Sequence, residues 1–279
     1  PEVKVIYKHT VEHRGVLILR GPGLSNKVSD VDPHKVGAKV LKAKPLDNTP
    51  EAKITAEVLN EFTRRSHEVL AEHPVNKERV KRGLPPANVV LARGAGKLPH
   101  IISFKEKYHM KAAAIAGIAL IKGIARAVGM DVLEVKGATG GLNTDVKAKF
   151  SKALEALRGD YDFVFLHIKG TDAASHDGDV KAKIGMIERV DDVLGWFLSE
   201  VDLSKLIIAI TSDHATPITV KDHTGDAVPL LIAWDEIVSD DVNSFDERAC
   251  MKGGLGVLTG KDLMNVIANF MGKLEKFGE

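Results

Sequence analysis

The chain has 279 residues, 44% hydrophobic and 28% charged, and this composition fits one or two globular domains with a sizeable core. With a formal net charge of +1, the chain has no strong overall positive potential that would attract nucleic acid or an anionic membrane. No apolar run reaches the roughly 18 residues of a membrane-spanning helix. The single cysteine, Cys250, excludes an intrachain disulfide framework and fits a reducing, cytoplasmic compartment.

The first hundred residues predict short strands, loops and one long helix. The apolar runs at 3–7 and 15–21 predict two strands. Residues 49–73 carry apolar side chains at helical spacing, and Thr49 followed by proline is typical of a helix start. The stretch "ANVVLARGAG" at 87–96 predicts a strand that runs into a glycine-rich turn.

From about residue 111 the pattern changes to alternating strands and helices. Strands are predicted at 112–117, 131–135, 162–168, 205–213 and 228–234. Helices are predicted at 119–129, 144–159, 179–201 and 260–277, with Gly129 as a stop and Thr144 as a candidate cap. This alternation predicts an α/β fold with an open, largely parallel sheet and helices on both faces.

Aspartates and histidines gather where the strongest of these strands end. Ligands of doubly wound sheets bind at the carboxyl ends of the strands. The segments "TDAASHDGD", "TSDHATP" and "KDHTGD" supply this set of residues: Asp172, His176, Asp213, His214 and His223. Mixed imidazole and carboxylate ligands suit Mn²⁺, Zn²⁺, Fe²⁺ or Co²⁺ better than Ca²⁺. Any single Asp–His pair is more often solvated than ligating, but the joint pattern indicates a metal site. His167, on the strand itself, is interpreted as a satisfied core histidine.

These segments resemble the metal-binding motifs of the alkaline phosphatase superfamily, and more narrowly those of archaeal-type cofactor-independent phosphoglycerate mutases. The likeness extends to "RGAG", "KAAAIAGIALIKGIARAVGM", "GATGG", "ACMKGGLG" and the closing "EKFG". It implies an alkaline-phosphatase-like, largely parallel sheet flanked by helices, with a smaller inserted α/β domain. Residues 1–104 would be part of the inserted substrate-binding domain, and residues 105–279 would be the metal-binding domain.

The resemblance also implies two divalent ions, Mn²⁺ or alternatively Mg²⁺, Zn²⁺ or Co²⁺, with no need for 2,3-bisphosphoglycerate. Asp172, His176 and His223 would bind the first ion, and Asp213 and His214 would contribute to the second. The family reaction passes through a phosphoserine, as 3-phosphoglycerate and 2-phosphoglycerate interconvert in glycolysis and gluconeogenesis. Two cations would stabilise the attacking and leaving oxygens.

The front of the chain departs from the family pattern, because the N-terminal Asp-Gly strand motif and the segment with the nucleophilic serine are absent. The nucleophile is therefore expected to be missing from this chain. Four serines, Ser25, Ser29, Ser103 and Ser175, do not sit in that motif. The chain alone is expected to be inactive and to pair with the missing segment or to self-associate.

A phosphoglycerate is small and strongly anionic, so basic side chains must hold it. The candidate substrate-binding residues are Arg14 in "EHRG", Arg93 in "RGAG", Lys111 in "HMKAAA" with Lys107 as its alternative, and Asp32 and His34 in "DVDPH". For each basic residue, a solvated side chain is the competing interpretation.

Three functions remain open at this point. The first is the mutase, an isomerase acting on a small-molecule substrate. The second is a phosphatase or sulfatase of the same superfamily that shares the metal ligands. The third is a non-catalytic, metal-binding fragment. A closed basic pocket that keeps glycerate in and water out would favour the mutase over the hydrolase.

Overall fold

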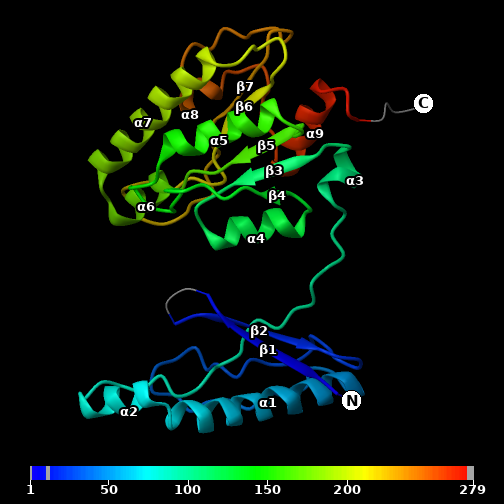
Figure 1. The fold of residues 1–279 in the computed structure, drawn as a ribbon, viewed down its shortest axis with the longest axis vertical. Helices are drawn as coiled ribbons and strands as arrows, with labels where there is room; N and C mark the ends of the chain where they lie inside the picture. Colours follow the sequence, from blue (N-terminus) through cyan, green and yellow to red (C-terminus); the bar gives the residue numbers. More distant parts are fainter. Residues whose placement is uncertain (1, 11–12, 275–279) are drawn as a thin grey trace. The chain divides into compact units, whose positions relative to one another are not determined.

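The computed structural model describes residues 2–10 and 13–274, and it divides into two compact units, residues 1–100 and 101–279 (Figure 1). The sequence placed the boundary after residue 104. The difference arises because Ser103 caps the helix that opens the second unit: its side chain accepts a hydrogen bond from the backbone of Glu106, and the Glu106 carboxylate accepts one from the backbone of Ser103. A helix and its cap belong to the same unit.

The first unit is built on a hairpin and a long helix. Strands β1 (Lys4–His9) and β2 (Gly15–Arg20) pair antiparallel, and helices α1 (Pro50–Ala71) and α2 (Pro74–Lys81) follow. The core of this unit contains Val28, Ala43, Ala56 and Leu59, against which Leu17, Leu19 and Ala92 pack. Of the predicted apolar stripe of α1, Leu59 lies in this core, whereas Val69 is 68% exposed, so only part of the stripe is core.

Helix α1 begins where the sequence predicts, because the Thr49 side chain accepts a hydrogen bond from the backbone of Ala52 and proline occupies the first helical turn. The strand predicted at 87–96 is wrong. Its backbone groups bond elsewhere: the Val90 amide donates to the Ser66 hydroxyl at 3.1 Å, and the Ala92 carbonyl accepts from the Val31 amide at 2.9 Å. The segment therefore bonds to α1 and to a loop rather than within a strand ladder.

The second unit contains a short parallel sheet with the strand order β4-β3-β5. Its strands are β3 (Ala112–Ile115), β4 (Asp131–Val132) and β5 (Phe163–Leu166). All residues of β3 are buried, which explains its continuous apolar run. Helices α4 (Ala119–Ala127) and α5 (Val146–Arg158) both contact β3, and Figure 1 shows them on opposite sides of the sheet.

Strands β6 (Ile208–Thr211) and β7 (Leu230–Ala233) exist as predicted, but they pair with each other antiparallel. The parallel part of the fold is thus confined to β3, β4 and β5. A loop connects β6 to β7, and an isolated bridge between Ala215 and Thr224 closes it. Antiparallel strands need no crossover helix.

The other helices of this unit are α3 (Phe104–Tyr108), α6 (Gly170–Asp177), α7 (Val180–Ser199), α8 (Glu247–Cys250) and α9 (Gly260–Phe270). Helix α9 ends before the predicted limit at 277, and the predicted end together with "EKFG" at 275–278 lies outside the described residues. Phe104, Tyr108, Met110, Ala112 and Ala268 form a buried cluster that anchors α3 and α9 to β3. Among the described helices, none is both long and apolar enough to cross a membrane.

Helix α4 stops as predicted, with Gly129 in the left-handed region at φ 78°. Helix α5 begins one residue later than predicted. Its cap is Asp145, whose side chain accepts from the Ala148 amide at 2.8 Å. The Thr144 hydroxyl instead accepts from the Thr139 amide at 3.1 Å, so it closes the preceding glycine-rich loop.

Lys149 on α5 is fully buried, with 0% of its surface exposed. Its Nζ donates to the carbonyl oxygens of His167 at 3.0 Å and Thr139 at 3.3 Å. Burial lowers the pKa of Lys149, because the charged ammonium loses hydration.

We expect the free energy of unfolding of the wild type, relative to Lys149→Met, to rise with pH. The unfolded state holds the Lys149 proton more tightly than the folded state. The stability that Lys149 contributes therefore rises as pH increases from its lowered folded-state pKa to the ordinary value of 10.5, and it is lost as pH falls through the lowered pKa. Urea unfolding from neutral pH to about pH 10 measures it. A difference that does not change with pH would contradict the expectation.

Candidate metal centre

Two of the predicted ligands lie on one face of the short helix α6. Residues Gly170–Asp177 are helical, and Gly178, at φ 74°, ends the helix. Asp172 and His176 are four residues apart, so the helix places them on the same face. The His176 Nε2 lies 3.3 Å from the Asp172 Oδ1.

The other predicted ligands follow β6. Asp213 and His214 come directly after the strand, and the loop that follows returns His223 to the same place. The rings of His214 and His223 are tilted by 30° to one another, with centroids 3.7 Å apart. The His223 Nε2 lies 3.4 Å from the Asp172 Oδ1 and 3.2 Å from the His176 Nε2.

The structure therefore brings all of the predicted ligands to one end of the second unit. Ligand atoms of Asp172, His214 and His223 lie within 4.8 Å of one another, and the His176 Nε2 faces the same carboxylate. Asp213 is the most exposed member, with its Oδ2 3.6 Å from the His214 Nε2. The resemblance assigned His214 to a second ion, whereas its nitrogen lies within reach of the first set. The division between two ions stays a prediction.

Backbone and hydroxyl groups fix the imidazoles. The His176 Nδ1 lies 2.9 Å from the Lys221 carbonyl oxygen, which can only accept. This contact orients the His176 ring so that its Nε2 faces the Asp172 carboxylate. The His214 Nδ1 lies 3.1 Å from the Thr216 hydroxyl. Such contacts orient metal-binding histidines and select their tautomers.

The carboxylate of Asp172 is held in its ionised form. Burial by itself raises its pKa, but hydrogen bonds from the Lys169 ammonium and the Thr216 hydroxyl outweigh burial and lower it. Lys169 pairs with the Asp172 Oδ2, and the Thr216 hydroxyl donates to the Asp172 Oδ1 at 2.9 Å. A carboxylate surrounded by several imidazoles fits a divalent transition-metal ion.

Sequence reasoning missed Lys169, Thr216 and the carbonyl of Lys221. Lys169 stands three residues before Asp172, and this spacing is the only signal that would have suggested a contact. Thr216 and Lys221 act across more than forty residues of chain, and no local pattern marks them.

His167 differs from its interpretation as a satisfied core histidine. Within the described part of the chain, its buried Nδ1 has no hydrogen-bond partner. Burial lowers the pKa of His167, and the nearby Asp213 opposes this effect. The imidazole is therefore neutral and polar, and it lies near the candidate centre.

The serines that the sequence raised have structural hydrogen bonds. Ser175 is fully buried in α6, and its hydroxyl donates to the Thr171 carbonyl at 3.0 Å. Ser25 and Ser29 accept from the backbone amides of nearby loops, and Ser103 caps α3. In this geometry the Ser175 hydroxyl points into its own helix, not toward the ligands.

The first unit brings together part of the predicted substrate set. The Arg93 Nη1 lies 3.2 Å from the His34 Nδ1 and 3.9 Å from the Asp32 Oδ2. The His34 amide donates to the Asp32 Oδ1 at 2.8 Å, and this turn holds His34 in the left-handed region at φ 50°. A hollow of about 580 Å³ borders Asp30, Asp32 and His34.

Asp30 is a member of this group that the sequence did not indicate. Its Oδ1 accepts from the Gly94 amide at 2.8 Å, and its Oδ2 lies 3.3 Å from the His34 Nε2. The Gly94 amide first, and His34 second, lower the pKa of Asp30. The carboxylate therefore ties the "RGAG" turn to the "DVDPH" loop.

Arg14 and Lys111 are not part of these groups. Arg14 is exposed where the chain enters β2. Lys111 precedes the amino end of β3, whereas the candidate ligands follow the carboxyl ends of strands. Its Nζ lies 3.9 Å from the Asp160 Oδ2 and 4.7 Å from the centre of the Tyr161 ring. The alternative Lys107, on α3, has its Nζ 5.1 Å from the Tyr108 ring centre.

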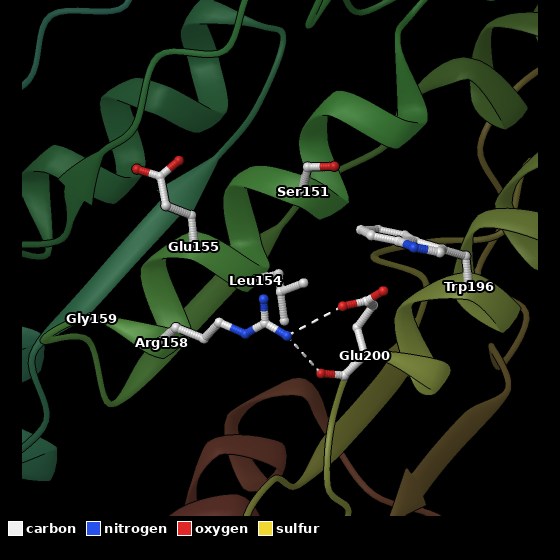
Figure 2. A pocket seen from close by; sticks show the side chains of 7 residues that line it. All are labelled: Ser151, Leu154, Glu155, Arg158, Gly159, Trp196 and Glu200. Atoms are coloured by element: carbon white, nitrogen blue, oxygen red, sulfur yellow. Dashed lines mark hydrogen bonds and ion pairs between the residues drawn. The ribbon is translucent and has the colours of Figure 1, made fainter.

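A second hollow, of about 450 Å³, lies between α5 and α7 (Figure 2). Figure 2 shows Trp196 on α7 and Leu154 on α5 beside it, with the Arg158 guanidinium bonded to the carbonyl and carboxylate of Glu200. None of the predicted site residues lines this hollow. Its charges are already paired, so it is not the predicted centre.

Comparison with known proteins identifies the family. The profile of the metalloenzyme superfamily matches residues 27–269. A 2,3-bisphosphoglycerate-independent phosphoglycerate mutase of Ignicoccus hospitalis is 54% identical over 99% of this chain and 66% of its own length. Mutase 1 of Methanothermobacter thermautotrophicus is 48% identical over 99% of this chain and 67% of its own length. The chain belongs to the metalloenzyme superfamily and to the 2,3-bisphosphoglycerate-independent phosphoglycerate mutase family.

Solved structures agree with this membership in the phosphoglycerate mutase family. The cofactor-independent phosphoglycerate mutase of Thermoplasma acidophilum is 33% identical with a TM-score of 0.75, over 96% of this chain and 66% of that one. A Pyrococcus horikoshii protein is 50% identical with a TM-score of 0.77, over 82% of this chain and 60% of that one. The expected fold class and family are confirmed. The chain spans about 66% of the length of the first of these relatives.

Proposed function

We propose that this protein interconverts 3-phosphoglycerate and 2-phosphoglycerate with divalent ions held by Asp172 and the surrounding histidines. The observation that carries the proposal is the convergence of Asp172, His214 and His223 within 4.8 Å, with His176 on the same carboxylate. The names of the mutase relatives supply the substrate class. Two ions, with Mn²⁺ preferred over Mg²⁺, Zn²⁺ or Co²⁺, and a place in glycolysis and gluconeogenesis belong to the same proposal.

Bound divalent ions would stabilise negative charge on the oxygens that attack and leave during phosphoryl transfer. Several residues of this chain set the charge and orientation of the candidate metal ligands. Lys169 and Thr216 lower the pKa of Asp172, and the Lys221 carbonyl orients the His176 ring so that its Nε2 faces Asp172. Asp213 adds a second carboxylate beside His214.

The substrate-binding part of the proposal rests on Arg93, His34 and Asp32. The guanidinium of Arg93 is 57% exposed, so it is free to form a bidentate contact with a phosphate or carboxylate. Asp30 and Asp32 flank Arg93 and His34 and hold their orientation. Arg14 and Lys111 are proposed as peripheral contacts, since both are exposed bases.

A coupled assay tests the proposal directly. The protein is supplied with Mn²⁺ and 3-phosphoglycerate but without 2,3-bisphosphoglycerate, and enolase converts any 2-phosphoglycerate to a product that absorbs in the ultraviolet. Inorganic phosphate is measured in parallel. Formation of 2-phosphoglycerate without phosphate release supports the mutase, whereas phosphate release alone would show a phosphatase.

We expect Ser175→Ala to leave mutase activity within about twofold of wild type, since changes that remove no substrate or metal contact cost little. The Ser175 hydroxyl is buried and bonded to Thr171 in its own helix, so the nucleophile is a different group. The coupled assay compares the rate of 2-phosphoglycerate formation in Ser175→Ala with the rate in a wild type that shows mutase activity. Complete loss in a variant that still binds Mn²⁺ would identify Ser175 as the nucleophile.

A further inference from the structure

A buried lysine and a glycine-rich loop lie behind the candidate centre. The "GATGG" loop connects β4 to α5, and its Thr139 carbonyl accepts from the Lys149 ammonium. Lys149 also donates to the carbonyl of His167, directly after β5. Lys149 thus joins the segments that follow β4 and β5, the two strands on either side of β3.

The loop is closely packed on its other side. Side chains cannot be added at Gly117 or Gly140, because a Cβ there would overlap the Thr139 carbonyl and the Ile118 side chain, respectively. A Cβ at Gly140 would also lie 4.0 Å from the Lys169 Cδ, so the loop borders the stem of Lys169. The loop backbone therefore passes beside the Lys169 side chain.

Lys169 is the link to the metal ligands. Its ammonium pairs with the Asp172 Oδ2, and Asp172 is the carboxylate that His176 and His223 face. One route runs from Lys149 through the Thr139 carbonyl and the glycine-rich loop to Lys169. The other runs from Lys149 through the His167 carbonyl, two residues before Lys169 in the chain. Both routes end at residues that orient Asp172.

We propose that Lys149 is a positioning residue of the metal centre: its buried ammonium fixes the 137–144 loop and the end of β5, and so sets the Lys169–Asp172 pair. This deepens the proposed function and rests on it. A buried ammonium is costly, and it is retained here beside two carbonyls with no carboxylate contact in the described residues. Changes to groups that orient ligands typically lower metal affinity about 10–100-fold.

The test compares Lys149→Met with Lys152→Met in the full 279-residue chain. Lys152 lies on the same helix, but it is a surface residue that pairs with Glu155. Mn²⁺ binding is followed by electron paramagnetic resonance, and hydrogen exchange is measured without metal on the amides of 139–142 and 168–172. Lys149→Met should raise the Mn²⁺ Kd about tenfold or more and speed exchange in both segments, and Lys152→Met should change neither.

Lys149→Gln is the second variant, in case the methionine side chain prevents folding. Its amide is polar but shorter than the lysine side chain, so it cannot reach both carbonyls. The same rise in Kd and the same faster exchange are expected. A folded Lys149→Met or Lys149→Gln with wild-type exchange in both segments overturns the inference, with or without metal binding. Absence of Mn²⁺ binding in the wild type would instead overturn the proposed function, and hydrogen exchange still decides the role of Lys149.

Discussion

Asp172→Asn should weaken Mn²⁺ binding by about 100-fold or more, beyond the usual effect of altering an orienting group. Asp172 is the carboxylate that His176 and His223 both face, and it is the partner of the Lys169 ammonium. The amide has nearly the same shape but no charge, so the site loses an anionic ligand and Lys169 loses its counter-ion. Isothermal titration calorimetry measures the Mn²⁺ Kd and stoichiometry.

Asp192→Asn is the matched control, because it removes one carboxylate from the exposed surface of α7. It should leave the Mn²⁺ Kd unchanged. If Asp172→Asn retained a Kd within about twofold of wild type while the protein stayed folded, Asp172 could not be a ligand, because losing an anionic ligand costs far more than this. The cluster would then have to bind metal through the histidines and Asp213.

Arg93→Ala should raise the KM for 3-phosphoglycerate by about 10–100-fold, the range expected for losing a charge-assisted, bidentate contact. The Mn²⁺ Kd should not change, because the Arg93 guanidinium contacts His34 and Asp32 rather than any candidate ligand. Arg93→Lys should recover only part of the loss, since an ammonium cannot reproduce the planar fork. Steady-state kinetics and metal titration are measured on the same preparations.

Arg65→Ala provides the control within the same unit. Arg65 is exposed on α1, and its guanidinium pairs with Glu61 at 2.6 Å. Removing it changes the net charge by the same amount and should leave the KM unchanged. A wild-type KM in Arg93→Ala, or an equal rise in both variants, would count against a specific contact between Arg93 and the substrate.

The regular elements were predictable where local chemistry alone decides them. Helix α1 starts at Thr49 because the cap and the proline act within one turn, and β3 is a strand because a buried parallel strand needs a continuous apolar run. The segment 87–96 has the same apolar content but no strand partner, since its amides and carbonyls bond to α1 and to a loop. Sequence alone does not separate such a partly buried apolar segment from a strand.

The candidate ligands were suggested by aspartates and histidines that follow apolar strand runs. Only Asp172 and His176 follow a strand of the parallel sheet, whereas the other candidates follow β6, which pairs antiparallel with β7. The groups around these ligands were not suggested in this way. Thr216 and the Lys221 carbonyl reach Asp172 and His176 from a distant loop, and a backbone carbonyl carries no side-chain signal at all. The buried position of Lys149 also depends on the tertiary fold, since lysines on a helix usually face water.

The loop that carries His223 reaches α6 through a contact between two left-handed residues, Gly178 and Lys221. The Lys221 side chain fills the space that a Cβ at Gly178 would occupy, with its Nζ 2.7 Å from that point. The two halves of the ligand set therefore lie beside these two turns. An ion that binds both halves of the ligand set would stabilise the native state. At an ion concentration 100 times its Kd, the free energy of unfolding would rise by about 2.7 kcal/mol. Chelation would then lower the melting temperature of the second unit by mass action, without breaking any covalent bond.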